Sequence, residues 1–396
     1  MILLKNCRLL RELTEGFDGS YADILIDGKV IREIREPGRG LSVPCETKDL
    51  RNATVLPGLF DLHCHLGCFN LSPADILTKT PLESAFLAYA FARDYLRQGY
   101  TTIRDCGSNY HTAIAARNAI HQGIVPGPRV FAPGLIVTPT ERGNETFGPL
   151  YAEADGADEV TKACRAEFKN GADFIKYMVS GAFGNEGGEP GQTIATFEEL
   201  RAAVVLAQSK NAYVAAHAHG ADAIKLSVQA GVRTIEHATF IDSEGIEMVR
   251  NAEDCYLIPT LAIEKALADH PEHAPAELRA KTAALPDAYR AGIRAAYDSG
   301  LPLGWGSDID HGHFKSKPGY EFVARKELLG FDNVEMLKQA TVYSARCLGL
   351  ESSLGTVKEN KLADLIAIDG DPDEDIYAMR QLPVMVMREG VLYSSF

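Results

Sequence analysis

The pattern of apolar and polar positions divides the chain into three stretches, with changes near residues 55 and 350. Residues 1–55 alternate apolar and polar positions over short runs at 2–4, 22–26 and 30–34, and Gly28 and Gly38 mark turns. Alternation with a period of two is typical of half-buried strands. We therefore expect a β-rich piece at the start of the sequence.

Between residues 56 and 349, short apolar runs alternate with helical patterns. The apolar runs are 54–62, 101–106, 129–133, 174–178, 213–218, 233–237, 256–260 and 301–307. The helical patterns are 82–98, 112–121, 157–170, 197–209, 221–230, 243–251, 276–299 and 334–348. Strands that alternate with helices form parallel units, and eight such units predict an α/β protein with a (β/α)8 barrel. The alternative, an open doubly wound sheet, needs a glycine-rich phosphate turn after its first strand, and the sequence has none there.

The last stretch, residues 350–396, returns to the strand pattern. Strands are expected at 365–368 and 384–388, with a turn-rich segment at 369–373 between them. Chain termini often lie close together, and the simplest arrangement pairs this stretch with residues 1–55. The predicted domains are therefore a small β domain, 1–55 with 350–396, and the barrel, 56–349.

Composition narrows the class of partner. Hydrophobic residues make up 46% of the 396 residues and the formal net charge is −14, which argues against a nucleic-acid or anionic membrane surface. The eight cysteines are scattered without a Cys-x-x-Cys pair, as in reduced cytoplasmic proteins. We expect neither a signal peptide nor a membrane helix. The expectation is a cytoplasmic protein that acts on a small molecule, and a homo-oligomer is compatible with the sequence.

The first barrel strand is expected to end in His63-Cys64-His65. Alternation along a strand puts His63 and His65 on one face, where two imidazoles can chelate a divalent metal. An isolated His-x-His is a weak signal, because two solvated histidines explain it equally well. Cys64 and Cys68 do not by themselves make a structural zinc site, which needs a second pair of ligands.

Later strand ends carry residues of matching chemistry. Active-site groups of such barrels collect at the carboxyl ends of the strands, and the polar residues there are Lys176, His217, His219, His237 and Asp308. Each has an ordinary explanation: a lysine extends its amine to water, a core histidine is satisfied, an aspartate caps the next segment. One shared site explains them together better than separate explanations do.

The set His-x-His, Lys, His, His and Asp resembles the two-metal form of the amidohydrolase superfamily. The tail at 355–368, GTVKENKLADLIAI, resembles that superfamily's return to its small β-sandwich. Segments 174–181, 214–220 and 234–237 are most similar to the imidazolonepropionase-like branch, which includes prolidase-like and Xaa-Arg dipeptidases. The resemblance implies a distorted TIM barrel with a β-sandwich built from both termini.

The resemblance also implies a role for Lys176. In similar enzymes CO2 converts this lysine to N6-carboxylysine, whose carbamate bridges two divalent metals, expected here to be zinc. The lysine must first lose its proton, which an apolar strand favours by desolvation. On this pattern one metal is held by His63, His65 and Asp308 and the other by His217 and His237, with Lys176 spanning both.

The implied reaction is hydrolysis of the amide bond of a dipeptide or N-acyl amino acid with a free carboxylate. A hydroxide between the metals attacks the carbonyl, and Asp308 takes up the proton and delivers it to the leaving amine. His219 is a candidate for catalysis and for substrate binding. Where similar enzymes often have Gly-Gly-His, this chain has TPTERGN at 138–144; Arg142 is a candidate for gripping the carboxylate, and His311 and His313 for lining the mouth.

Two other functions stay open at this point. An enzyme of the same fold could open a cyclic amide or deaminate a heterocycle, although an imidazolonepropionase is expected to show Asp-Glu where this chain has His219-Gly220. The second is a non-enzymatic binding or structural protein with the same barrel. The polar groups at the strand ends argue against it, because buried polar groups cost free energy and such a protein would not need them.

Overall fold

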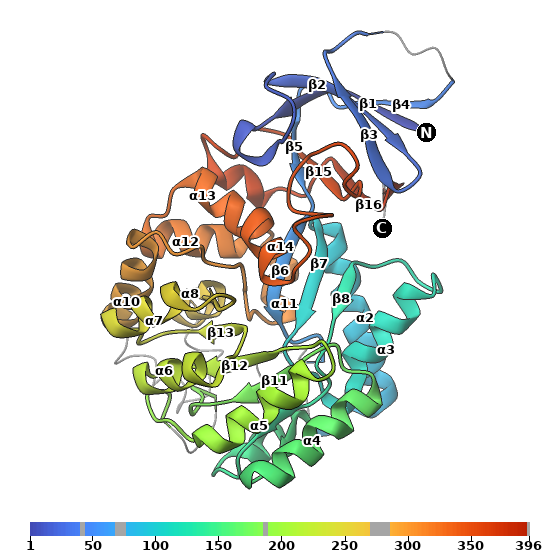
Figure 1. Cartoon of the computed structure of the whole chain (residues 1–396). Helices are drawn as coiled ribbons and strands as arrows, with labels where there is room; N and C mark the ends of the chain where they lie inside the picture. The colour runs from blue at the N-terminus through green and yellow to red at the C-terminus, as the bar shows by residue number, and fades with distance from the viewer. Residues whose placement is uncertain (40–43, 68–76, 185–188, 270–285, 394–396) are drawn as a thin grey trace. The chain divides into compact units, whose positions relative to one another are not determined.

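A computed structural model describes residues 1–39, 44–67, 77–184, 189–269 and 286–393 (Figure 1). The chain divides into two compact units. The first contains Met1–Asp61, Arg93–Ile103 and Phe314–Phe396, and the second contains Leu62–Ala92 and Arg104–His313. Among the described helices, none combines the length and the apolar character needed to cross a lipid bilayer.

One sheet of the first unit takes strands from both ends of the sequence. Its order is β17-β16-β15-β5-β1-β2-β3, with β4 beside β1. The bounds are β1 Ile2–Leu9, β2 Tyr21–Asp27, β3 Val30–Arg35, β4 Glu46–Asp49, β5 Thr54–Pro57, β15 Leu365–Ile368, β16 Met385–Arg388 and β17 Val391–Leu392. β15 pairs antiparallel with both β5 and β16. The guanidinium of Arg8 also binds both oxygens of Asp373, at 2.8 and 2.9 Å, so the two ends of the chain are joined by side chains as well as by the sheet.

The helices of the first unit follow the second unit in sequence. They are α12 Tyr320–Leu329, α13 Asn333–Lys338, a π-helical turn Gln339–Tyr343 and α14 Ser344–Cys347, with 3-10 turns at Arg11–Leu13 and Ile376–Arg380. The helix expected at 334–348 is therefore three consecutive helical pieces. Within α12, Arg325 Nε donates to Glu321 Oε1 at 2.6 Å, and both side chains are fully buried.

The second unit contains a six-stranded parallel sheet with the order β10-β9-β11-β12-β13-β14. Its strands are β9 Ile136–Thr138, β10 Tyr151–Glu153, β11 Ile175–Met178, β12 Val214–Ala218, β13 Thr234–His237 and β14 Tyr256–Ile258. Every residue of β11, β12 and β13 is buried, as expected for parallel strands covered by crossover helices. Figure 1 shows α4, α5 and α6 alongside these strands.

The predicted helices of this unit lie close to their expected positions, whereas the helices at 261–269 and 311–316 were not predicted. They are α2 Pro81–Arg97, which ends in the first unit, α3 Thr112–His121, α4 Gly156–Asn170, α5 Phe197–Gln208, α6 Ala221–Ala230, α7 Ser243–Asn251, α8 Leu261–Asp269, α10 Pro286–Asp298 and α11 His311–Ser316, with 3-10 turns at Asn109–His111 and Asn144–Leu150. α3, α6 and α7 have the predicted bounds. The predicted start of α10, residue 276, lies outside the described residues.

A separate three-stranded sheet carries the first candidate histidines. It has the order β6-β7-β8, with β6 Leu59–Cys64, β7 Tyr100–Asp105 and β8 Arg129–Phe131. Beyond the end of β8, the carbonyl oxygen of Ala132 accepts a hydrogen bond from Asp173 N at 2.9 Å, immediately before β11. The two sheets therefore adjoin at this edge.

The eighth predicted strand, 301–307, is not a regular strand. It forms one isolated bridge, between Gly306 and Thr260. Pro302 has no N–H to donate, and glycine is poorly suited to a strand interior. Two hydrogen bonds nevertheless join this segment to its neighbours: Gly304 N donates to the oxygen of Leu257 in β14 at 2.9 Å, and Leu62 N of β6 donates to the oxygen of Trp305 at 2.7 Å.

Close packing at Gly306 generates a prediction about the fold. A Cβ built there would lie 2.8 Å from His63 Cβ and 2.8 Å from Ile258 Cγ2. We expect Gly306→Ala to destabilise the protein by about 1–3 kcal/mol, the usual cost of overpacking, measured as a lower urea midpoint. Gly191→Ala is the control, because a Cβ there meets no atom within 4 Å. Unchanged stability of Gly306→Ala would contradict this packing.

Candidate metal centre

The carboxyl ends of β11, β12 and β13 bring three of the candidate residues together. In the parallel register, Lys176 lies opposite Ala215, two residues before His217, and His237 lies opposite Ala218. Strands in such a sheet end at one edge, so their terminal side chains share a single region. All three side chains are buried.

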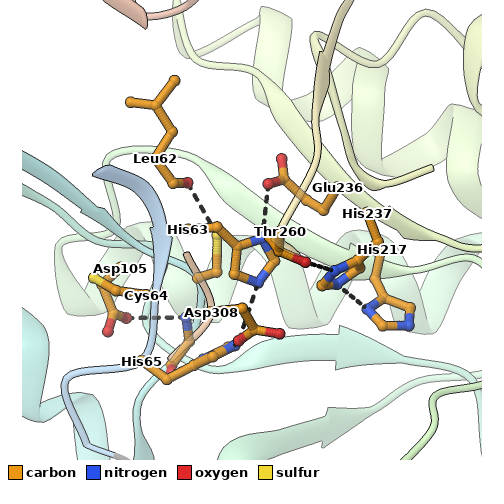
Figure 2. A network of polar contacts seen from close by, with 12 residues as sticks. Leu62, His63, Cys64, His65, Asp105, His217, Glu236, His237, Thr260 and Asp308 are labelled. Carbon is orange, nitrogen blue, oxygen red and sulfur yellow. Dashed lines mark hydrogen bonds and ion pairs between the residues drawn. The ribbon is translucent and has the colours of Figure 1, made fainter. Parts of the chain in front are cut away.

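His63, His65 and Asp308 form a first group of possible ligands. One side-chain atom from each lies within 4.8 Å of the others. Asp308 Oδ1 is 3.7 Å from His63 Nε2 and 3.4 Å from His65 Nε2, and Figure 2 shows the carboxylate facing both rings. The backbone N–H of Asp308 donates to the oxygen of His63 at 2.8 Å, which holds the end of the irregular eighth segment beside β6.

His217, His219 and His237 form a second group, again with one atom from each within 4.8 Å of the others. His237 Nε2 and His217 Nδ1 face one another at 3.0 Å (Figure 2). The ring of His219 stacks on that of His237, with centroids 4.6 Å apart. The ring of His63 lies 4.7 Å from that of His237, so the two groups form one continuous cluster.

The outer nitrogens of these rings are hydrogen-bonded, which fixes where the lone pairs point. His65 Nδ1 lies 2.7 Å from the oxygen of Gly107, and His217 Nε2 lies 3.3 Å from the oxygen of Gly181. A carbonyl oxygen only accepts, so these nitrogens carry the hydrogen. The lone pairs of the neutral rings therefore lie on His65 Nε2, toward Asp308, and on His217 Nδ1, toward His237.

The remaining rings are held in the same way. His63 Nδ1 donates to Glu236 Oε2 at 2.8 Å. His237 Nδ1 and His219 Nδ1 contact hydroxyl groups, those of Thr260 at 2.8 Å and Thr239 at 2.6 Å respectively. One nitrogen of each ring is thus committed to the surrounding protein, and the other is left for the site.

All five imidazoles are neutral at neutral pH. Burial is the main cause that lowers the pKa of each ring, and the charge of Lys176 lowers each pKa further. The pKa of His65 falls to about 4 and that of His219 to about 3. Neutral imidazole is the form that binds a metal, so the protein environment favours the ligand state of these residues.

The charge of Lys176 is among the causes that lower the pKa of all five rings. Its side chain is 1% exposed, and Nζ has no hydrogen-bond partner among the described residues. A buried amine without a partner is costly. This orphaned atom fits a donor set in which Lys176 is completed by a further group.

The backbone is strained at two of the proposed ligands. His237 has φ 67° and Asp308 has φ 51°, and Ala238 follows with φ 53°. Residues other than glycine rarely adopt this left-handed conformation, and where they do the surrounding structure must compensate for the strain. Such strain is concentrated at functional sites, in agreement with the placement of these side chains.

Two charged residues of the site are not apparent from the sequence. Arg104 and Glu236 lie within apolar runs, and both are 0% exposed. Arg104 Nη2 donates to Glu236 Oε1 at 2.7 Å. A charged residue inside an otherwise apolar strand was the available signal, but its partner is more than a hundred residues away and cannot be deduced from spacing.

Asp105 is a third charged residue within an apolar run, and it supports His65 through Gly107. Its carboxylate accepts hydrogen bonds from the N–H groups of Leu66 and Gly107 and from the Ser108 hydroxyl, at 2.8, 2.9 and 2.6 Å. Burial raises the pKa of Asp105 to about 6. Gly107, whose carbonyl binds His65, is therefore held in place by Asp105, two residues earlier.

The other sequence candidates lie in different surroundings. Arg142 is exposed on a turn, and its backbone N–H donates to Glu141 Oε1. His311 is buried with its ring 4.8 Å from that of Phe91, and His313 Nδ1 lies 2.6 Å from an oxygen of Asp310. A role of these three residues in substrate binding stays a prediction.

Cys64, next to His63, belongs to neither of these two ligand groups. The thiol of Cys64 donates to the backbone oxygen of Arg104, with Sγ 3.6 Å away. Cys68 lies outside the described residues.

Comparison with known proteins gives a consistent result. The model of the amidohydrolase family matches residues 54–392. Ochratoxinase of Aspergillus niger is 29% identical to the chain over 407 aligned positions, which cover 96% of this chain and 80% of that protein.

Two solved structures are similar over nearly the whole chain. One is a Xaa-Pro dipeptidase with bound methionine in the active site, with 31% identity, a TM-score of 0.87 and full coverage of both chains. The other is a prolidase in complex with N-methylphosphonate-L-proline, with 29% identity, a TM-score of 0.88 and 99% coverage of both chains.

Proposed function

Because the chain belongs to the amidohydrolase family, and is thus a hydrolase of amide or peptide bonds, we propose that it acts on a dipeptide or an N-acyl amino acid with a free carboxylate. The observation that carries the chemistry is the orientation of the buried imidazoles around Lys176, with their outer nitrogens committed to the protein. The similar structures with methionine and a proline phosphonate support a substrate that contains an amino acid with a free carboxylate.

The donor set fits two divalent metal ions, and zinc is the expected ion, since it prefers imidazole and carboxylate ligands in sites of this kind. His63, His65 and Asp308 would hold one ion, and His217 and His237 the other. When bound, these ions would activate water as a nucleophile at neutral pH and polarise the scissile carbonyl.

Lys176 would be shared between the two ions as N6-carboxylysine. The ammonium of Lys176 first loses one proton, and the neutral amine then adds to CO2. A C–N bond forms, one C=O π bond of CO2 breaks and a second proton leaves, so that a cation is replaced by an anionic carbamate. The orphaned, buried Nζ supports this proposal, because the carbamate provides two oxygen ligands where an ammonium provides none.

Asp308 would be the acid–base group. Its side chain is 22% exposed, compared with 1% for His63 and 19% for His65, so substrate can reach the carboxylate. It would hold the proton released by the attacking water and return it to the leaving amine.

His219 would contact the substrate carboxylate or the oxyanion that forms at the carbonyl. Its Nδ1 is bound to the Thr239 hydroxyl, which orients the ring and leaves the second nitrogen for the substrate. Arg142, which lies on an exposed turn, and His311 and His313, which lie in α11, are proposed as further substrate-binding residues.

The architecture that supports this site is proposed to be a distorted (β/α)8 barrel over residues 56–349. The bond from Asp173 N to the oxygen of Ala132, and those that tie 304–305 to β14 and β6, support closure of the ring. Residues 1–55 and 350–396 would form the small β-sandwich domain, and the sheet shared by both ends supports this. We also retain the proposals of a cytoplasmic location and a homo-oligomer.

The first test of this function uses a panel of dipeptides and N-acyl amino acids. Protein prepared without chelator should contain about two divalent ions per chain, as in two-metal hydrolases, and should release free amino acid. Removal of metal should abolish this activity and zinc should restore it. Full activity in metal-free protein would refute the metal centre, whereas ring opening of a cyclic amide without release of amino acid would favour the alternative chemistry.

Lys176→Ala tests the carbamate. We expect it to lose most of its activity and to retain less metal, because the shared ligand is gone. Addition of a short-chain carboxylic acid should restore part of the activity by supplying the missing oxygens. A mass increase of the intact native protein that matches one CO2, and is absent from the variant, provides an independent measurement. Full activity and metal content in Lys176→Ala would rule out the bridging role.

Asp308→Asn separates proton transfer from metal binding. The amide keeps an oxygen for the metal but cannot take up and return a proton, so we expect substantial metal content with a fall in kcat of about 10²–10⁴-fold. His219→Ala and Arg142→Ala should instead raise KM and leave the metal content unchanged. Turnover of Asp308→Asn close to wild type would remove Asp308 from this role.

A further inference from the structure

The geometry points to Glu236 and Arg104 as a buried positioning pair for the metal ligand His63. The carboxylate of Glu236 holds Nδ1–H of His63 and thereby aims Nε2 at the first metal position, while Arg104 fixes the carboxylate. This inference rests on the metal centre of the proposed function, and its readout is metal affinity rather than turnover.

Glu236 contacts His63 directly, and both side chains are buried. Glu236 Oε2 lies 2.8 Å from His63 Nδ1, and the two side chains are 0% and 1% exposed. The opposite nitrogen of the ring, Nε2, faces Asp308 (Figure 2). The Glu236 carboxylate therefore holds the His63 ring at Nδ1, and the lone pair on Nε2 points toward Asp308.

The second oxygen of Glu236 has its own partners. Oε1 accepts from Arg104 Nη2 at 2.7 Å and from the hydroxyl of Thr234 at 2.6 Å. Both oxygens of the carboxylate are thus hydrogen-bonded. The carboxylate cannot rotate without breaking hydrogen bonds in a buried site, which costs the full desolvation of the group.

Arg104 is anchored at three further points. Its Nε donates to the oxygen of Leu62 at 2.6 Å, Nη1 donates to Thr234 Oγ1 at 2.7 Å, and the guanidinium lies 5.4 Å from the centroid of the Phe174 ring. The side chain starts on β7 and touches β6 and β13, so the carboxylate is set by three strands and not by a loop. That rigidity is what a metal ligand requires of its support.

His63 differs from the other four rings in the kind of partner it has. At the outer nitrogen, His65 and His217 contact backbone carbonyls, and His219 and His237 contact hydroxyls. His63 contacts an anion. A carboxylate behind a ligating histidine increases the basicity of the ring and the metal affinity, and its removal typically lowers that affinity about 10- to 100-fold.

Cys106 offers a competing explanation, because its Sγ, His63 and Glu236 also lie within 4.8 Å of one another and could themselves hold an ion. The hydrogen bonds argue against it. His63 Nδ1 and both oxygens of Glu236 are already engaged, and burial raises the pKa of the Cys106 thiol to about 12. We therefore interpret Glu236 as a residue that orients the ligand His63, and not as a ligand of a separate ion with Cys106.

The simpler alternative is that Glu236 serves only as the counter-ion of Arg104. Two variants separate the possibilities. Glu236→Gln keeps the shape but loses the charge. The double variant Arg104→Met/Glu236→Leu removes both buried charges together, and such replacements are often neutral or stabilising. Glu321→Gln is the matched control, since Glu321 is paired with buried Arg325 in the other compact unit.

The measurement is the affinity of metal-free protein for Zn²⁺, by competition with a chromophoric chelator, alongside the melting temperature of the same metal-free samples. We expect Glu236→Gln to bind zinc about 10- to 100-fold more weakly than wild type and Glu321→Gln to bind it as wild type does. The double variant should regain the melting temperature lost in Glu236→Gln but not the zinc affinity.

Zinc affinity restored in the double variant along with stability would overturn the inference, because Glu236 would then be needed only by Arg104. Unchanged affinity in Glu236→Gln would overturn it as well, while leaving the metal centre intact. Wild-type protein that fails to bind zinc would overturn both this inference and the metal centre of the proposed function.

Discussion

Five imidazoles and one lysine lie at or near strand ends of the second unit, and all of them except the partly exposed His65 are buried. A buried polar nitrogen is stable only when it is hydrogen-bonded. Here the outer nitrogen of each ring is bound by a carbonyl, a hydroxyl or a carboxylate of the protein. Burial then keeps the rings uncharged and leaves their second nitrogens for a ligand. The left-handed backbone at His237 and Asp308 is part of the cost of this arrangement.

Strand alternation and strand-end position allowed the sequence to predict which candidate residues lie close together. His63 and His65 could be placed on one face because the side-chain period of a strand is two, and helices such as Thr112–His121 followed from apolar periodicity. The support of the site could not be predicted in the same way. Glu236 and His63 are 173 residues apart, and no pattern in the sequence links them. The eighth strand was expected from its apolar character, but Pro302 and its glycines leave only a bridge at Gly306.

The proposed metal ligands and the proposed substrate-binding residues lie in different kinds of structure. Lys176, His217 and His237 lie in strands whose hydrogen-bond register fixes them, whereas Arg142 lies on an exposed turn. Loops tolerate sequence change more readily than the strands that carry them.

The shared sheet of the first unit has a consequence for how the protein is made. β5 ends at Pro57 and its partner β15 begins at Leu365, so 307 residues (364 − 57) separate two strands that pair directly. At ~5–20 residues per second, a ribosome needs about 15–60 s to synthesise that interval. During this time β5 has an unpaired edge, and such edges are prone to association with other chains. Chaperone binding to the nascent N-terminal strands would therefore matter more for this protein than for one whose sheets close locally.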